Sequence, residues 1–586
     1  MSRSDTMSLK TFWETVERRL AACSSGQLRA ILRSMAQETP LTRRQTFLET
    51  LERVQETGDA VQNALRQDDL LADVAHLAAA LKAAAELAGG RYGRPGREGY
   101  DDQGSARPYA EFVEPLEALF DRAEAAFDYG HLPLARAAYQ GLFEILRLQD
   151  SRGRGVSVSS LTGVDGGHAF ARYLRAVYET EPLESRPQAL FEHMQPAARY
   201  GLVGLRPSLG ALLRASTRPL PDREHFITDW IAFLRLQSGG AADAWLREAV
   251  RLSQGTDGLK MLARTEGRSR PRAYLDWFDA LEEEDRLQEV FAAALEALQA
   301  LPPTLPIRAA IADHLCAAAA RLSDAEALHA GRWEAFLAQP LLSRLLDLWD
   351  AAPTEDKRTL WMRLAVAHVR DRLAHPPVHH IEVGWDADST RGPVWVGTLV
   401  LAHGCLLAGE FDAARRLAEG GHVLGWSTGD NPQGLITSTF LVLLSGHSPD
   451  ELPPNLAQVW QWGLDSGTDS SSSAGAAPMR ERLEGAYAER FATASLSDGA
   501  QESLLSWCLD VAQRRVGAIV GGERRGSYGR VAVLTAACAE VLRLRGQAET
   551  ATALAREMGD RFPGHRAFQT ELRAALQNGG FIRSPA

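Results

Sequence analysis

The most regular hydrophobic pattern of the chain lies in residues 274–349 and has the period of an amphipathic helix. The first segment shows apolar positions spaced i, i+3, i+4 and i+7, at Tyr274, Trp277, Phe278 and Leu281. Segments that start at Leu287 and Leu342 repeat the pattern. Each helix then carries one apolar stripe, which must be buried against a neighbour. The pattern therefore predicts four or five consecutive helices that stack as antiparallel hairpins.

The spacing G-x4-A is shared by three expected turns between helices outside this stretch, at Gly130–Ala135, Gly409–Ala414 and Gly546–Ala551. It resembles the turn of tetratricopeptide repeats, where glycine tolerates the left-handed conformation and alanine lets the second helix pack closely. The intervals between the motifs are not multiples of 34 residues, the length of that repeat. We therefore predict an all-α fold: an irregular, tetratricopeptide-like α-solenoid of helical hairpins with a separate C-terminal helical unit.

Changes in composition along the chain suggest where its domains begin and end. Residues 89–107 are rich in Gly, Arg and Pro, and residues 466–478 are rich in Ser, Gly and Ala, which is typical of linkers. The expected divisions are an N-terminal helical domain (1–88), a linker (89–107), a helical-hairpin array (108–374), further hairpins (375–465), a second linker (466–478) and a C-terminal helical domain (479–586).

Composition narrows the class of protein. The 586 residues include 64 Lys and Arg against 75 Asp and Glu, a net charge of −11, which does not favour general nucleic-acid binding. The five cysteines are scattered and form no CxxC pair, so neither a zinc knuckle nor a disulfide framework is indicated. The first ten residues are polar, and no apolar run reaches the roughly 20 residues that cross a bilayer. A cytoplasmic protein with no membrane contact is expected.

A G-x-S-x-G motif at 425–429 is the clearest candidate for enzymatic chemistry. In α/β-hydrolases this motif holds a nucleophilic serine, here Ser427, on a strained turn between a strand and a helix. The residues before it have a helical pattern, and segments typical of strands are scarce throughout the chain. We interpret the motif as a turn between two helices and keep a hydrolase as an alternative.

Histidines are densest around residues 368–380, where His375, His379 and His380 follow His368. Imidazoles at short spacing can bind zinc, and Glu382 or Asp386 would complete a site. Two prolines, however, place the group on an irregular loop. A metal-dependent enzyme that uses the His375–His380 loop is thus a second form of the enzyme alternative. The isolated His314, on the apolar face of its helix, is interpreted as a core or half-buried histidine.

The strongest basic cluster lies near the C-terminus and supplies the candidate binding residues: Arg514, Arg515, Arg524, Arg525, Tyr528 and Arg530. An arginine-rich loop with several glycines suits contact with phosphate, an acidic partner, or acidic parts of the same chain. A nucleic-acid-associated regulator that uses the Arg514–Arg530 face is therefore a further alternative.

Several segments together resemble the long helical region of bacterial SWIM-zinc-finger-associated and related uncharacterised proteins. They are the segments 273–277 (AYLDW), 301–308 (LPPTLPIR), 332–336 (RWEAF), 425–434 (GWSTGDNPQG) and 514–520 (RRVGAIV). The resemblance covers about residues 110–576 and implies a helical repeat-like body. The zinc signature of that family, C-x-C followed by C-x-H, is absent, so zinc and nucleic-acid binding are not implied.

These patterns favour a non-catalytic scaffold or adaptor, because solenoids expose extended surfaces that suit protein partners. We expect no enzymatic activity, no cofactor and no bound metal. The tryptophans of the middle third are expected mainly in the core, with some available to line a groove.

Overall fold

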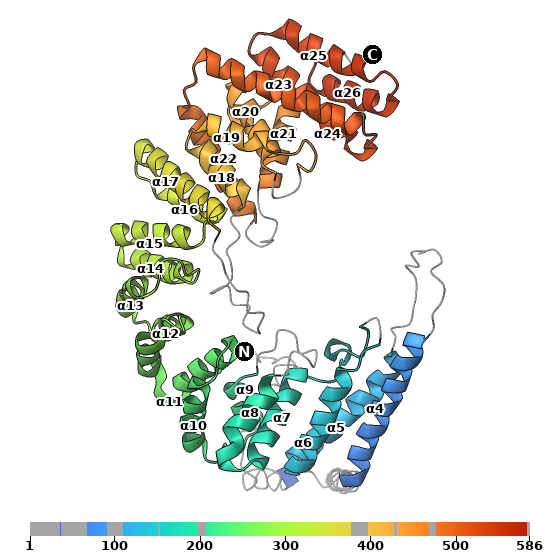
Figure 1. Ribbon diagram of the computed structural model, residues 1–586, viewed down its shortest axis with the longest axis vertical. Helices are drawn as coiled ribbons and strands as arrows, with labels where there is room; N and C mark the ends of the chain where they lie inside the picture. The colour runs from blue at the N-terminus through green and yellow to red at the C-terminus, as the bar shows by residue number, and fades with distance from the viewer. Residues whose placement is uncertain are drawn as a thin grey trace, which may run out of the picture. The chain divides into compact units, whose positions relative to one another are not determined.

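The computed structural model describes residues 35–36, 67–90, 109–150, 153–195, 207–376, 397–426, 431–467 and 476–582. All regular secondary structure in these ranges is helical (Figure 1). The helices pack mainly on their neighbours in sequence. The predicted all-α class and its serial arrangement are confirmed.

The described helices form two compact units, divided at residue 258. The division falls within α11 (Gly240–Glu266), three residues after Gly255, where the helix is interrupted by a φ of 63°. The other main helices of the first unit are α4 (Gln67–Gly90), α5 (Val113–Asp128), α6 (Leu132–Leu146), α7 (Gly166–Thr180), α8 (Arg186–Met194), α9 (Leu209–Arg214) and α10 (Arg223–Arg235).

Helix α4 packs on α5 and α6 rather than standing apart from them. A Cβ atom at Gly141 of α6 would lie 2.6 Å from Cγ1 of Val74, so glycine is needed for this close approach. Arg122 of α5 also pairs with Asp73 at 2.6 Å. The described part of the expected 1–88 domain therefore shares the core of the helices that follow. Nearly all the rest of that domain and of the 89–107 linker lies outside the described residues.

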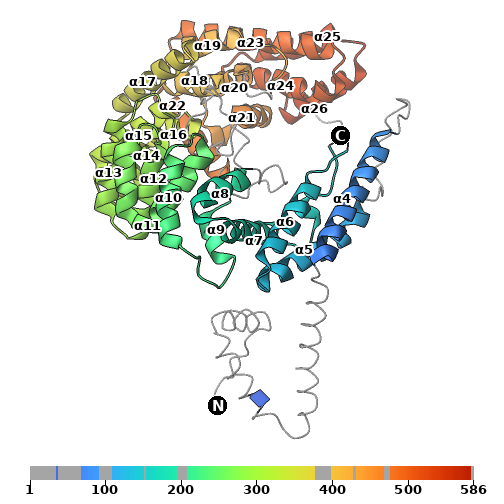
Figure 2. The same cartoon turned by 60° about the horizontal axis from the view of Figure 1, so that its bottom comes forward.

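The second unit begins with the predicted series of amphipathic helices. These are α12 (Arg272–Glu283), α13 (Leu287–Ala300), α14 (Arg308–Leu322), α15 (Ala325–Ala338) and α16 (Leu342–Ala351), followed by α17 (Glu355–Ala374). The four apolar positions that predicted α12 are all buried. Figure 2 shows the six helices following one another side by side.

All three G-x4-A motifs form helix–helix turns, as predicted. Gly130, Gly409 and Gly546 have φ values of 83°, 73° and 79°. The three alanines that follow are fully buried. In each turn the residue after glycine donates its N–H to the carbonyl five residues earlier, which closes the preceding helix in a Schellman motif.

Helices α18 to α26 complete the second unit. Their bounds are α18 (Thr398–Leu407), α19 (Phe411–Glu419), α20 (Gln433–Ser445), α21 (Pro454–Gly467), α22 (Ala476–Thr493), α23 (Asp498–Val520), α24 (Tyr528–Leu544), α25 (Ala548–Arg561) and α26 (Arg566–Asn578). Helix α20 is buried on nearly every side. One apolar core extends from Phe336 to Leu576, across the expected linker at 466–478. The described helices on both sides of that linker thus belong to one packed body, and the core does not divide where the composition suggested.

A buried carboxylate links distant helices within this body. Glu540 of α24 accepts hydrogen bonds from the Asn455 amide nitrogen (2.7 Å) and from the backbone N–H of Leu456 (2.8 Å). The carboxylate therefore caps the N-terminus of α21, where unpaired N–H groups favour negative charge. Burial raises the pKa of Glu540, while these hydrogen bonds act in the opposite direction.

None of the described helices is both long enough and apolar enough to cross a bilayer. The cytoplasmic location stays a prediction.

Candidate functional site

The structure divides the predicted basic cluster into exposed and buried members. Arg514 is exposed and pairs with Asp510 one helical turn earlier (2.9 Å). Arg524 and Arg525 are exposed in the turn between α23 and α24, and neither pairs with a carboxylate of the described residues. Tyr528 is only 3 % exposed and packs edge-on against Phe568. It therefore supports the core and takes no part in the exposed basic surface.

Arg515 lies inside the second unit. Arg515 is only 6 % exposed. The Cζ atom of its guanidinium lies 4.0 Å from the centre of the Trp426 ring, so the two groups stack. The guanidinium donates a hydrogen bond to the carbonyl oxygen of Val423 (2.5 Å). Burial, followed by repulsion from nearby Arg530, lowers the pKa of Arg515 to about 10. The group remains charged at neutral pH.

The second arginine of the site is Arg530, which lies on the next helix, α24. Its guanidinium lies 6.0 Å from the centre of the Trp462 ring. The two arginines and two tryptophans border a pocket of about 200 Å³. Its lining is drawn from α20, α21, α23, α24 and the segment before α20: Trp426, Gly434, Val459, Trp462, Gly463, Asp465, Arg515, Arg530 and Leu534. We call this the Arg–Trp pocket.

The sequence identified the arginines of this pocket but not its tryptophans. Trp426 falls within the G-x-S-x-G motif, and Trp462 lies on α21, more than fifty residues before Arg515. Only the packing of α20, α21, α23 and α24 brings these residues together (Figure 1). Trp426 is fixed by a hydrogen bond from its indole N–H to Gln433 (3.2 Å).

A second candidate is the exposed side of α15 and α17. The two helices meet through aromatic contacts, because the Trp361 ring packs edge-on against both His329 and Trp333. His368 adds a hydrogen-bond contact to the Leu337 carbonyl oxygen at 3.0 Å. Beside these contacts Leu360 and Leu364 are 52 % and 50 % exposed, and Leu337 is 36 % exposed. We call these three leucines, with Trp333 and Trp361, the α15–α17 surface.

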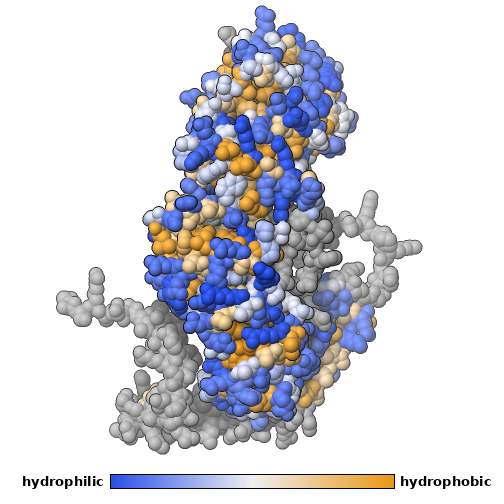
Figure 3. Space-filling model, turned by 60° about the vertical axis from the view of Figure 1, so that its left-hand side comes forward, coloured by the Kyte–Doolittle hydropathy of each residue, from blue (hydrophilic) through white to orange (hydrophobic). Residues whose placement is uncertain are grey.

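Figure 3 turns the side of the molecule that carries α12 to α17 toward the viewer. Hydrophobic residues, in orange, reach the surface there in several patches between hydrophilic ones. Leu360 and Leu364 lie four residues apart and thus on the same face of α17. Apolar side chains on the outer face of a helix do not serve its own core, so they mark surfaces that other molecules can cover.

The enzyme candidates of the sequence are only partly described. Ser427, His379 and His380 lie outside the described residues. The G-x-S-x-G motif does fall between two helices, α19 and α20. His375 is exposed next to Asp371 (3.1 Å), and His368 is half-buried on α17, where burial lowers its pKa.

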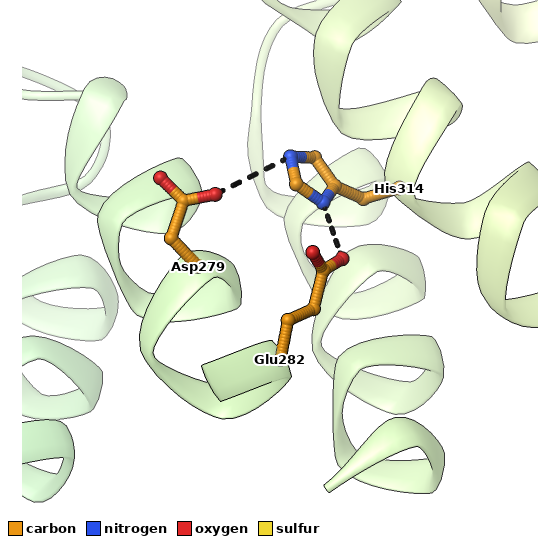
Figure 4. Close-up of side chains that lie close together, drawn as sticks. All are labelled: Asp279, Glu282 and His314. Carbon is orange, nitrogen blue, oxygen red and sulfur yellow. Dashed lines mark hydrogen bonds and ion pairs between the residues drawn. The ribbon is translucent and has the colours of Figure 1, made fainter. Parts of the chain in front are cut away.

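One histidine cluster was not expected from the sequence. His314 of α14 contacts two carboxylates of α12: its Nδ1 lies 2.7 Å from Glu282, and its Nε2 lies 3.9 Å from Asp279 (Figure 4). The ligand atoms of all three lie within 4.8 Å of one another. The two carboxylates, however, face different ring nitrogens, whereas an imidazole gives a metal ion one nitrogen. The arrangement suits a polar link between α12 and α14, beside the contact of His314 with Phe278.

The sequence matches no model of a known protein family, and no curated protein is significantly similar to it. The resemblance to SWIM-associated proteins stays a prediction.

Proposed function

We propose that the protein is a non-catalytic helical scaffold or adaptor that binds a protein partner. The observation that carries this proposal is the α15–α17 surface, where leucines are half-exposed beside partly exposed tryptophans. Covering a leucine that is half-exposed recovers part of the roughly 1.5–3 kcal/mol that full burial of such a side chain contributes. Aromatic side chains such as these tryptophans are enriched at the centres of protein interfaces.

The position of this surface within a helical series supports the same function. Helices α12 to α17 pack on their neighbours in sequence, so the backbone that carries the exposed side chains is ordered before a partner arrives. A surface that is already ordered loses less conformational entropy on binding.

The test is an affinity capture from the native cell lysate with the tagged full chain, analysed by mass spectrometry. We expect a stoichiometric protein that is captured by the native chain and lost with the double variant Leu360→Asp, Leu364→Asp. The control is Leu236→Asp, which makes the same kind of substitution, with one added negative charge instead of two, at a leucine that is 85 % exposed in the first unit.

Other outcomes would contradict the proposal. Capture that is equal for the native chain and the double variant would exclude the α15–α17 surface. Recovery of nucleic acid alone, abolished by Arg524→Ala with Arg525→Ala and by moderate salt, would favour the nucleic-acid alternative.

A further inference from the structure

The Arg–Trp pocket contains more positive charge than the described residues neutralise. Arg515 is buried and makes no ion pair with them, and neither does Arg530. Instead, the two guanidinium groups are close enough to repel each other. A buried charge without a counterion is costly, and a bound anion removes that cost.

Arg515 also has unused hydrogen-bonding capacity. A guanidinium carries five N–H donors, and within the described part of the chain Arg515 donates one hydrogen bond, to Val423. Its planar face is already occupied by Trp426, so its remaining donors lie in the plane of the group. In-plane donors of arginine match the two oxygens of a carboxylate.

The other walls of the pocket are apolar and flat. Val459 and Leu534 are buried, while Trp426 and Trp462 present partly exposed ring systems. Gly434 packs directly against Trp426, because a Cβ atom there would lie only 3.2 Å from the indole ring. Arg530 and Asp465 are exposed, which gives the pocket an opening to solvent on their side.

The charge and the apolar walls together indicate which anion fits. The one carboxylate of the lining, Asp465, is paired with Arg480 at 2.6 Å, so Arg515 and Arg530 keep a net positive charge that an anion balances. The apolar walls favour a carboxylate on an apolar body over inorganic phosphate, which has no apolar surface to bury. We propose that the Arg–Trp pocket binds a small carboxylate carried on a flat apolar body, such as an aromatic acid. This site is independent of the proposed partner surface on α15 and α17.

In this arrangement the carboxylate lies between Arg515 and Arg530, and the flat body lies between the tryptophans. Charged hydrogen bonds fix the acid group, and ring contacts hold the apolar part. The pocket would therefore discriminate against a neutral amide of the same shape and against an anion without an apolar body.

The experiment is titration calorimetry of the full chain with 2-naphthoate, 2-naphthamide and inorganic phosphate. For a ligand of about 13 non-hydrogen atoms we expect 2-naphthoate to bind with a Kd of about 1 mM or tighter. The amide and phosphate should each bind at least about tenfold more weakly, since each lacks one of the two contacts.

Variants show whether the binding occurs at the Arg–Trp pocket. Arg530→Met should weaken naphthoate binding about tenfold or more, and this exposed position tolerates the change without loss of the fold. Arg515→Met should have at least the same effect, with circular dichroism as a check on folding. Arg524→Met removes an exposed arginine outside the pocket and should leave the Kd unchanged.

Three results would overturn the inference. The first is that naphthoate gives no heat of binding at about 5 mM, well above the expected Kd. The second is that 2-naphthamide or phosphate binds as tightly as 2-naphthoate. The third is that Arg530→Met leaves the Kd for naphthoate unchanged. None of these results would bear on capture of a protein at α15–α17, so the two proposals are tested separately.

Discussion

At the scale of single residues, burial controls the chemistry of the cysteines. Cys405, Cys508 and Cys538 are buried in the second unit, and Cys316 is half-buried. Burial raises the pKa of Cys405 and Cys316 to about 11 and that of Cys538 to about 12. These thiols are therefore protonated at neutral pH.

We predict that Cys405, Cys508 and Cys538 react with iodoacetamide only after unfolding. At pH 8 the native chain should show little labelling of the three peptides by mass spectrometry, and the chain in urea should show complete labelling. Rapid labelling of the native protein would contradict the burial described here.

Unfolding returns the pKa of each buried thiol toward 9, so the unfolded state loses its thiol protons at lower pH than the folded state. The free energy of unfolding should therefore fall as the pH rises above 9.

The sequence pattern identified the arginines of the Arg–Trp pocket but did not predict how the pocket is arranged in space. Arg515 and Arg530 were grouped by proximity in sequence, together with Tyr528. Which of these face a pocket depends on helices that come from elsewhere in the chain. The sequence alone therefore does not show that Tyr528 is buried in the core while Arg530 lines a pocket.

At the scale of elements, the hairpin turn is the recurring unit. The sequence located three turns whose left-handed residue is glycine, at Gly130, Gly409 and Gly546. The structure contains the same closing hydrogen bond after Asp285, Ser323 and Glu523, which also have positive φ values of 54°, 59° and 55°. Because aspartate and serine are common in many kinds of loop, these turns gave no sequence signal.

We predict that Gly546→Ala lowers the free energy of unfolding by about 1 kcal/mol, because a Cβ atom is disfavoured at a φ of 79°. A Cβ atom at this position meets no atom within 4 Å, so the backbone alone causes the loss. Chemical denaturation of the full chain measures the effect.

The matched control is Gly499→Ala in the first turn of α23, where space is also open and φ is not positive. Alanine there should be neutral or stabilising by up to about 1 kcal/mol. Equal effects of the two substitutions would argue against a conformational cause at Gly546.

At the scale of the molecule, the second unit is held together across the segment 466–478. Besides the common core, Arg482 of α22 pairs with Asp347 and Asp350 of α16, each at 2.7 Å. Composition marked the segment correctly as rich in Ser, Gly and Ala, but composition does not report which helices pack together. Contacts between residues more than a hundred positions apart require the fold itself.

We predict that cutting the chain between residues 471 and 472, at an inserted protease site, leaves the two pieces associated. They should elute together in size-exclusion chromatography and separate only in denaturant, because the helices on both sides share apolar contacts. Separate elution without denaturant would restore the independent C-terminal domain that the composition suggested.

The cap that Glu540 provides for α21 has a consequence for the order of folding. Residues 455 and 540 are 85 positions apart, so α21 is synthesised well before the carboxylate that completes its first turn. Until α24 has followed, the first N–H groups of α21 and the side chain of Asn455 must be satisfied by water. The core of the second unit thus closes late in synthesis, and a chain that stops before residue 540 lacks an acceptor that this helix uses in the native state.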